Sequence, residues 1–429
     1  MLCAFRACER QSCRVRGMCE SWGVTITGPP SPDVADRERL LVVASTFPVP
    51  GALGVPPFVG TLTSELTSHF DVRVLTVMRG PSGGCRASLK NNAELIAIGR
   101  RRAGPIRVGL LSEWSSAGQR YRELFLLLRW FIAIIRECQR FRPRVIHIHW
   151  GFPVPPLLRT ARLLRLIPRV RYVVTMHGSD VQLLASRWRR LIRFGLVGAS
   201  SVTCVNSVQL KAIGTLGIKH LRPTLLAMPI EPSFFARHRT DRTSPAQALR
   251  VLFVGRLVEG KGLERLLSAH AIVRESHDVE LTVVGDGPLM NSARSEHPDV
   301  VFTGSRTSAE VSEQMQSASL VVLPFDGPEG LPVTVLEAMA SEVPIVVTRT
   351  VGITDLEALG ARFFSVDPEA SHPDLAAVIR DALSAITQCP AEVRSMTAAN
   401  IKLAKRFSSG VLGERARQVL SEGATDGQS

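Results

Sequence analysis

The chain of 429 residues is long enough for two or three domains, and with 45% apolar residues it can build large cores. No repeat, coiled-coil pattern or low-complexity array is present, which excludes fibrous and repeat architectures. The net charge of +14 is uneven: residues 39–239 hold 30 basic against 8 acidic residues, whereas residues 240–429 hold 17 basic against 25 acidic. Such asymmetry indicates that the first half faces an anionic partner, either nucleic acid, an anionic membrane or a phosphorylated substrate.

The first 38 residues carry five arginines, among them Arg6, Arg10, Arg14 and Arg16, but no apolar core of a secretory signal, so we expect a disordered tail or a misplaced start codon. Four of the eight cysteines lie in this segment, at spacings of five and six that differ from the tight pairs of zinc sites. Reduced thiols of a cytosolic protein are therefore favoured over a disulfide framework. The longest apolar stretch, Leu124–Ile135, is too short to span a bilayer and contains Arg129.

After residue 38, apolar runs rich in Val and Ile alternate with amphipathic stretches. Predicted strands cover 39–45, 72–77, 94–98, 145–149, 171–175 and 201–205, and predicted helices cover 58–69, 118–140, 155–166 and 207–216. This alternation predicts a parallel sheet covered on both faces.

A polar segment at residues 240–248 is the predicted linker, after which the pattern starts again. Predicted strands cover 250–254, 280–284, 300–302, 320–323, 345–348 and 362–366, and helices cover 263–275, 289–296, 309–317, 332–341 and 373–387. The predicted fold is α/β, with two Rossmann-like doubly wound domains (39–239 and 249–405) facing a cleft. Residues 406–429, the end of a helical stretch that begins at 391, are expected to pack back across the interface. Ligands of such sheets bind at the carboxyl ends of the strands.

A glycine-rich loop joins the first strand of the second domain to its first helix. Gly255, Gly260 and Gly262 allow a tight turn, while Arg256 and Lys261 stand beside a helix N-terminus. Two cations with free backbone N–H groups and the helix dipole suit a diphosphate. The alternative is two solvated charges on an ordinary loop, and a P-loop is excluded because its lysine motif is missing.

Two further loops follow strands in this half. Gly285-Asp286-Gly287 suits a turn that approaches a base or ribose, although Asp286 alone is more often a turn former. The stronger signal places Glu329, Gly330 and Leu331 in a loop before a helix that carries Glu337. Two carboxylates eight residues apart can accept hydrogen bonds from two parts of one molecule. The alternative for Glu337 alone is an ordinary helix glutamate that the helix dipole stabilises.

These motifs, in this order, resemble the retaining family 4 glycosyltransferases of the GT-B fold. The resemblance covers roughly the last 180 residues and implies that Arg256 and Lys261 contact the diphosphate of a nucleotide-sugar. It further implies that Glu329 contacts the donor sugar and Glu337 the ribose. The chain departs from the family at Glu342, where glycine is usual, and at Val351-Gly352, where a glycine pair is usual.

The first half resembles the family more loosely. The usual glycine pair after the first strand is reduced to Gly51 and Gly54, which we place on the acceptor side with His149 and Asp180. His177, in Thr-Met-His-Gly-Ser-Asp, matches a family histidine near the donor sugar and is a predicted catalytic residue. His149 is closer to an ordinary structural histidine.

The resemblance implies hexosyl transfer with retention, in which the leaving phosphate helps to take the acceptor proton. We expect no cofactor and no obligatory metal, since no Asp-x-Asp pair follows a suitable strand. Expected acceptors are a glycan, a lipid-linked molecule or a small molecule, in cell-surface polysaccharide or glycolipid synthesis.

Arginines interleave with Leu, Phe, Trp and Ile in residues 120–144 and 187–194. This pattern fits an interfacial helix on anionic lipid, so we expect a cytoplasmic protein, peripheral on the inner face of the plasma membrane. Nucleic acid is not an expected partner because no recognition module is present. A solvated arginine-rich face is the plain alternative.

Two other functions remain open at this point: a GT-B nucleotide-sugar epimerase, and a non-catalytic interaction protein on the same fold. The intact set of four motif residues opposes the second. A dinucleotide dehydrogenase is disfavoured because Gly-x-Gly-x-x-Gly does not follow the first strand.

Overall fold

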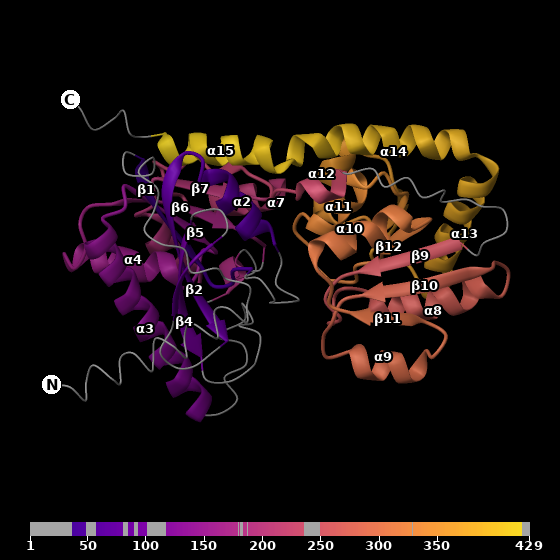
Figure 1. Ribbon diagram of the computed structural model, residues 1–429, viewed down its shortest axis with the longest axis horizontal. Helices are drawn as coiled ribbons and strands as arrows, with labels where there is room; N and C mark the ends of the chain where they lie inside the picture. The colour runs from indigo at the N-terminus through magenta and orange to yellow at the C-terminus, as the bar shows by residue number, and fades with distance from the viewer. Residues whose placement is uncertain are drawn as a thin grey trace. The chain divides into compact units, whose positions relative to one another are not determined.

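The computed structural model describes residues 37–48, 57–79, 85–89, 93–100, 117–178, 180, 183–186, 188–235, 249–327 and 329–422 (Figure 1). These residues form two compact units. The N-terminal unit holds the chain up to Val205, Gln209–Leu226 and the segment from Gly413, and the C-terminal unit holds Asn206–Val208 and Ala227–Leu412. The predicted linker, most of the predicted tail, Gly51 and Gly54 lie outside the described residues.

The N-terminal unit contains a sheet in the order β3-β4-β2-β1-β5-β6-β7-β8. Its strands are β1 (Glu38–Ala44), β2 (Phe70–Arg79), β3 (Cys85–Ser88), β4 (Glu94–Arg100), β5 (Val145–His149), β6 (Arg171–Met176), β7 (Ser201–Cys204) and β8 (Thr224–Leu225). All pair in parallel except β3, which is antiparallel to β4 at the edge. The last five residues of β1 are fully buried because helices cover both faces of the sheet.

The helices of this unit are α2 (Phe58–Leu66), α3 (Ala117–Phe141), α4 (Val154–Leu163), α6 (Arg189–Leu196) and α7 (Ser207–Gly214). Helix α4 packs against both α3 and α6. In the part of the chain that the structure describes, no helix combines the length and apolar character needed to cross a membrane.

The C-terminal unit has a fully parallel sheet in the order β11-β10-β9-β12-β13-β14. Its strands are β9 (Leu249–Val254), β10 (Val279–Val284), β11 (Val301–Gly304), β12 (Leu320–Leu323), β13 (Ile345–Thr348) and β14 (Phe364–Val366). Six strands of each sheet thus follow the Rossmann order 3-2-1-4-5-6. The predicted pair of doubly wound domains is confirmed.

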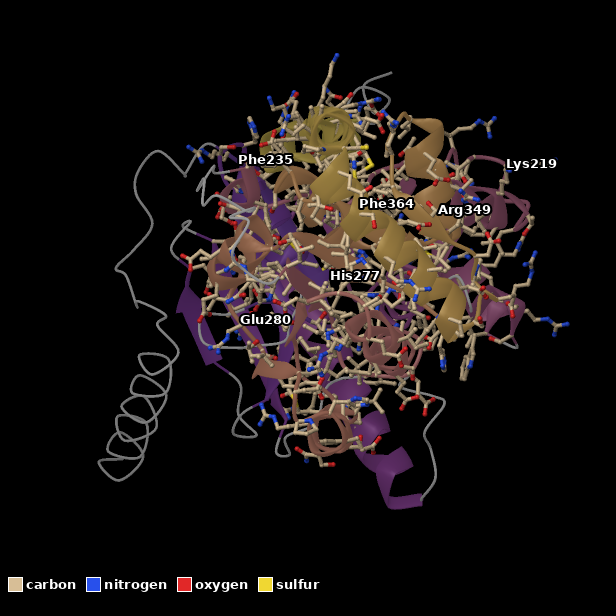
Figure 2. The ribbon with its side chains drawn as sticks, turned by 90° about the vertical axis from the view of Figure 1, so that its right-hand side faces the viewer. Lys219, Phe235, His277, Glu280, Arg349 and Phe364 are labelled. Atoms are coloured by element: carbon tan, nitrogen blue, oxygen red, sulfur yellow. The ribbon has the colours of Figure 1, made fainter. Side chains whose placement is uncertain are left out.

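The helices of the C-terminal unit are α8 (Leu263–Arg274), α9 (Met290–Glu296), α10 (Ser308–Ser317), α11 (Val333–Ala340), α12 (Val351–Ala358), α13 (His372–Gln388) and α14 (Pro390–Ala404). Strand β14 forms the sheet edge beside β13, and Figure 2 labels Phe364 on β14 and Arg349 directly after β13. The predicted final helical stretch is divided: α15 (Ser409–Ser421) follows the extended residue Ser408. Within the N-terminal unit, Arg171 Nη2 donates to the Leu420 carbonyl at 2.5 Å, which fixes the end of α15.

At one of the departures from the family, the backbone conformation favours the glycine that this chain lacks. Glu342 has a φ of 55°, a left-handed conformation that glycine adopts without steric cost. A glutamate there costs about 1–2 kcal/mol. Glycine would therefore relieve strain at this turn.

Candidate functional site

The motif loops of the C-terminal unit follow strands at the carboxyl end of its sheet. Gly255 comes directly after β9, Gly285 after β10, and Glu329 follows β12. Strands β9 and β12 are neighbours, and the strand order reverses between them. Open α/β sheets bind ligands at this switch point, outside the carboxyl ends of the strands.

The loops after β9 and β10 touch backbone to backbone. Gly285 has a φ of 145°, and a Cβ added there would lie 1.8 Å from the Gly255 carbonyl oxygen. A Cβ on Gly287 would lie 2.2 Å from the Leu257 carbonyl oxygen. Leu257 N–H donates to the Asp286 carbonyl at 3.0 Å. These positions require glycine because no side chain fits between the two loops.

The loops after β9 and β12 meet in the same way. Gly262 caps α8 with a φ of 76°, and a Cβ there would lie 1.8 Å from the Pro324 carbonyl oxygen. Gly327 N–H donates to the Gly260 carbonyl at 3.2 Å. A third contact of this kind joins Gly352 to Gly330, since a Cβ on Gly352 would lie 1.9 Å from the Gly330 carbonyl oxygen. The departure at Val351-Gly352 thus keeps the glycine that the packing requires.

This packing brings together two motif residues that are 68 positions apart. Lys261 Nζ and Glu329 Oε1 form an ion pair of 2.5 Å, and both side chains are about one-fifth exposed. Lys261 also lies over the Phe325 ring, 5.5 Å from its centroid. Arg256 is exposed and forms no ion pair with any residue that the structure describes. The site therefore presents one free cation and one paired cation beside the N-terminus of α8.

Glu337 lies on the second turn of α11 and is only 8% exposed. Burial, with a further contribution from Glu231, raises the pKa of Glu337 to about 8. The group is thus mostly protonated at neutral pH and offers an O–H donor, whereas the sequence argument assumed an ionised acceptor. Sequence reasoning also missed Glu231, because nothing in the chain signals that this residue influences Glu337.

Three histidines gather in the N-terminal unit, beside its own switch point between β1 and β5. His149 Nδ1 lies 2.9 Å from His177 Nε2, and the rings of His147 and His149 are 4.3 Å apart. His147 Nε2 lies 2.7 Å from the Thr175 hydroxyl. The sequence singled out His149 and His177, and the structure adds His147 and the ring contacts of Phe58 and Trp150 with His177.

Burial keeps these histidines neutral. It lowers the pKa of His147 to about 4, that of His177 to about 3 and that of His149 well below its usual value. Asp180 accepts hydrogen bonds from the backbone N–H groups of Gly151, His177 and Gly178 at 2.9–3.0 Å. Asp180 therefore shapes the loop that carries His177, and burial raises the pKa of this carboxyl.

The neutral histidines predict a pH-dependent stability. The unfolded chain binds a proton at His147 below pH 6.5, whereas the folded chain does so only below about pH 4. The free energy of unfolding therefore decreases as the pH falls through this window, by up to about 1.4 kcal/mol per pH unit for each such histidine. Glu337 opposes this trend, because between its ordinary pKa of 4.5 and about 8 the folded state binds the extra proton.

The measurement is urea unfolding at pH 6.5, 5.5 and 4.5. A His147→Gln variant, whose amide can still bond to Thr175, should lose stability less steeply than the unmodified chain. Parallel pH profiles for the two proteins would contradict the buried neutral state.

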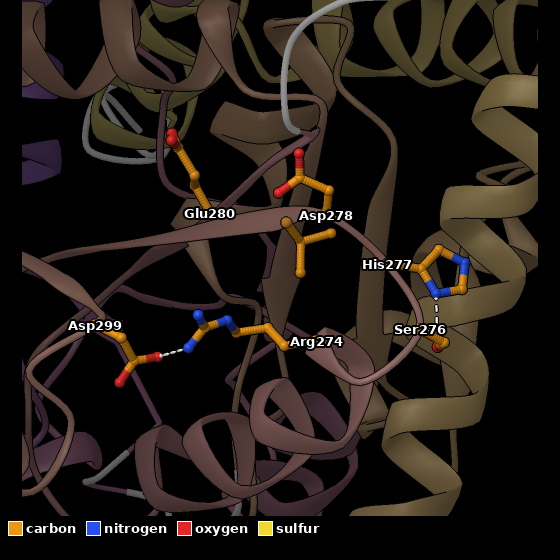
Figure 3. A pocket seen from close by; sticks show the side chains of 7 residues that line it. Arg274, Ser276, His277, Asp278, Glu280 and Asp299 are labelled. Atoms are coloured by element: carbon orange, nitrogen blue, oxygen red, sulfur yellow. Dashed lines mark hydrogen bonds and ion pairs between the residues drawn. The ribbon is translucent and has the colours of Figure 1, made fainter.

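A polar pocket of the C-terminal unit lies elsewhere (Figure 3). Its lining is Arg274, Ser276, His277, Asp278, Val279, Glu280 and Asp299. Arg274 is ion-paired with Asp299, and Ser276 Oγ lies 2.9 Å from His277 Nδ1. This pocket sits where β10 begins, the edge opposite the motif loops, and therefore is not the candidate site.

Two Rossmann-like units with a glycine-rich, cation-bearing switch point define the GT-B class of nucleotide-sugar enzymes. Residues 54–228 match the glycosyl transferase 4-like domain, and residues 248–385 match the glycosyl transferases group 1 domain. The chain belongs to the group 1, family 4 glycosyltransferases of the GT-B fold.

Relatives with known names agree with this family. The chain is 27% identical over 223 residues to the putative teichuronic acid biosynthesis glycosyltransferase TuaC of Bacillus subtilis, over 50% of this chain and 55% of TuaC. It is 26% identical over 296 residues to the amylovoran biosynthesis glycosyltransferase AmsK of Erwinia amylovora, over 65% of this chain and 70% of AmsK. The chain spans about half the length of several curated relatives, 48–60% for three of them.

Solved structures share the fold at low sequence identity. Anabaena HepE in complex with UDP and glucose superposes with a TM-score of 0.67 at 15% identity, over 90% of this chain and 100% of HepE. An E. coli protein described as trehalose-6-phosphate bound with UDP-2-fluoro glucose gives a TM-score of 0.69 at 13% identity, over 89% and 99%.

Proposed function

We propose that the chain transfers a hexose-type sugar from a nucleotide-diphosphate sugar to a glycan, a lipid-linked molecule or a small molecule. The proposed transfer retains the anomeric configuration and serves cell-surface polysaccharide or glycolipid synthesis, the context named for TuaC and AmsK. The observation that carries the proposal is the meeting of Lys261 and Glu329 beside the N-terminus of α8.

In this proposal Arg256, Lys261 and the first turn of α8 bind the diphosphate. Helix α8 is 12 residues long and has no side-chain cap at Gly262, so its first N–H groups can donate to phosphate oxygens. The same groups stabilise the negative charge that develops as the diphosphate leaves. No metal is required for that role, since the cations supply the charge.

The proposed sugar and ribose contacts come from the loop and helix after β12. Glu329 contacts the donor-sugar hydroxyls, Gly330 and Leu331 offer backbone N–H groups, and Glu337 contacts the ribose. Gly255, Gly285, Asp286 and Gly287 form the floor on which the nucleotide rests, because the backbone at Gly285 and Gly287 packs directly against the loop after β9. His177 is proposed to lie near the donor sugar.

The test is a panel of nucleotide-sugars screened by thermal shift. A donor present at 100 times its Kd adds about 2.7 kcal/mol to the free energy of unfolding and should raise the Tm by several degrees. The nucleoside alone serves as the control and should shift the Tm less, because it lacks the diphosphate. A panel without any binder would contradict the proposal, and epimerised donor formed without acceptor would favour an epimerase.

We further propose that the N-terminal unit binds an anionic membrane surface. On α3, Phe125, Leu128 and Ile132 are exposed at spacings of three and four residues, which places them on one helix face. At the end of α4 and in the loop that follows, Leu163, Leu164 and Leu166 are also exposed. Gln139 Nε2 donates to the Leu166 carbonyl at 2.9 Å, so the loop adjoins the end of α3.

Exposed arginines accompany these apolar side chains. Arg136 and Arg140 lie on α3, and Arg165 and Arg169 lie in the loop after α4. Apolar side chains that enter the headgroup region beside cations are the signature of an interfacial surface on anionic lipid. The excess positive charge of residues 39–239 supports the same partner.

Co-sedimentation with liposomes tests this surface. We expect the unmodified chain to bind vesicles containing phosphatidylglycerol. A variant with Leu163→Ser and Leu164→Ser should bind about tenfold more weakly, because two fewer leucine side chains enter the membrane. Val301→Ser is the matched control, because Val301 is similarly exposed but lies on β11 of the other unit. Equal binding to neutral and anionic vesicles would contradict the proposal.

A further inference from the structure

The hydrogen bond between His149 and His177 admits two proton placements. His149 Nδ1 and His177 Nε2 lie 2.9 Å apart, and burial keeps both rings neutral. Each neutral ring carries one N–H, so one ring donates and the other accepts. Either His149 donates from Nδ1, which leaves the His177 proton on Nδ1, or His177 donates from Nε2, which leaves its Nδ1 as a bare acceptor.

The surroundings of His149 distinguish the two placements. This side chain is 2% exposed, and its Nε2 is buried without a hydrogen-bond partner among the described residues. If His177 donated, the His149 proton would sit on that Nε2 as an orphaned buried N–H group. Orphaned N–H groups are rarer in protein interiors than under-used acceptors, and each costs about 1–3 kcal/mol. The favoured placement therefore puts the His149 proton on Nδ1.

We propose that His149 is a positioning residue that donates to His177 Nε2 and thereby holds the proton of His177 on Nδ1. His177 then presents an N–H donor to an oxygen of the bound nucleotide-sugar and cannot act as a general base. This role for His149 rests on the proposed function, because it assumes that a ligand oxygen lies near His177. The alternative is that His149, a buried histidine on a strand, has a structural role only.

The packing around His177 supports a fixed orientation. Its ring centroid lies 5.2 Å from that of Phe58 and 4.7 Å from that of Trp150. Asp180 accepts its backbone N–H at 3.0 Å. His177 makes no further side-chain hydrogen bond within the described part of the chain, and this residue is half-buried, whereas His147 and His149 are buried. The proposed Nδ1–H thus belongs to the least buried of the three rings.

The experiment reads the tautomer directly in the full chain labelled with ¹⁵N-histidine. Two-bond ¹H–¹⁵N correlation spectra distinguish Nδ1–H from Nε2–H rings, and the His177 signals are assigned by their loss in His177→Phe. We expect Nδ1–H for His177 in the unmodified protein and a change to Nε2–H in His149→Phe, with kcat about tenfold lower. His149→Asn, whose amide nitrogen can donate from nearly the place of Nδ1, should restore both.

His147→Gln is the matched control, because it removes a neighbouring buried histidine that bonds to Thr175 and forms no hydrogen bond with His177 in the described chain. It should leave the His177 tautomer unchanged. An Nε2–H ring at His177 in the unmodified protein, or an unaltered tautomer in His149→Phe, would overturn the proposal. Because the spectra are recorded without ligand, a failure of nucleotide-sugar binding would contradict the proposed function and leave the tautomer assignment intact.

Discussion

Replacing Lys261 with alanine is expected to lower kcat/KM by about 100- to 1000-fold, the loss typical of removing one group that stabilises a developing anion. The variant also leaves the Glu329 carboxylate, about one-fifth exposed, without its cation 2.5 Å away. Unpaired negative charge beside the proposed diphosphate position would repel the donor, so KM should rise as kcat falls. Steady-state kinetics with the donor found by thermal shift measures both.

Three companion variants separate catalysis from stability. Arg256→Ala should lose activity with an unchanged Tm, because Arg256 is exposed and forms no ion pair in the described chain. Arg274→Ala, at the end of α8 in the pocket away from the motif loops, should keep kcat/KM unchanged (Figure 3). Glu329→Gln keeps an acceptor for Lys261 but loses the charge. If Lys261→Ala and Arg256→Ala, still folded, kept near-normal kcat/KM, the diphosphate assignment would be wrong.

Replacing Gly262 with alanine should destabilise the C-terminal unit by several kcal/mol, enough to unfold a marginal domain. The added Cβ would lie 1.8 Å from the Pro324 carbonyl oxygen, so the loops after β9 and β12 would have to separate. Overpacking of this kind costs about 1–3 kcal/mol or more. The left-handed conformation adds about 1–2 kcal/mol.

Gly304→Ala isolates the second contribution. Gly304 has the same φ of 76° as Gly262, yet nothing lies within 4 Å of its added Cβ. The difference in free energy of unfolding between the two variants, from urea titration, is therefore the cost of the clash alone. Equal destabilisation by Gly262→Ala and Gly304→Ala would show that the loops after β9 and β12 separate without cost. That result would contradict the tight backbone packing described for the site.

The strands could be predicted where a buried strand has an uninterrupted apolar sequence. Strands β5, β12 and β13 have the predicted bounds, because buried runs of Val, Ile and Leu have few alternatives to a parallel strand. Strand β3 was missed, since Cys85–Ser88 is short, lacks an apolar run and lies antiparallel at the sheet edge. Helix α12 was missed because Val351, Gly352 and Ile353 are poor helix formers, and packing of buried residues overrides their propensity.

The site was predictable in outline and not in its electrostatics. Motif order placed Lys261 and Glu329 on one sheet edge, but their direct pairing depends on glycine contacts that only the fold reveals. The raised pKa of Glu337 depends on its burial and on Glu231, which lies far away in sequence. The roles of these residues toward a ligand stay predictions until binding is measured.

The backbone contacts among the glycine loops restrict how this protein can be re-engineered. Where carbonyl oxygens of one loop fill the space that a Cβ on the next would need, the loops cannot be lengthened or exchanged one at a time. Libraries that vary these loops should therefore leave Gly262, Gly285 and Gly287 untouched. Diversity belongs at exposed side chains such as Asp286 and Asp326, which can change without moving the main chain.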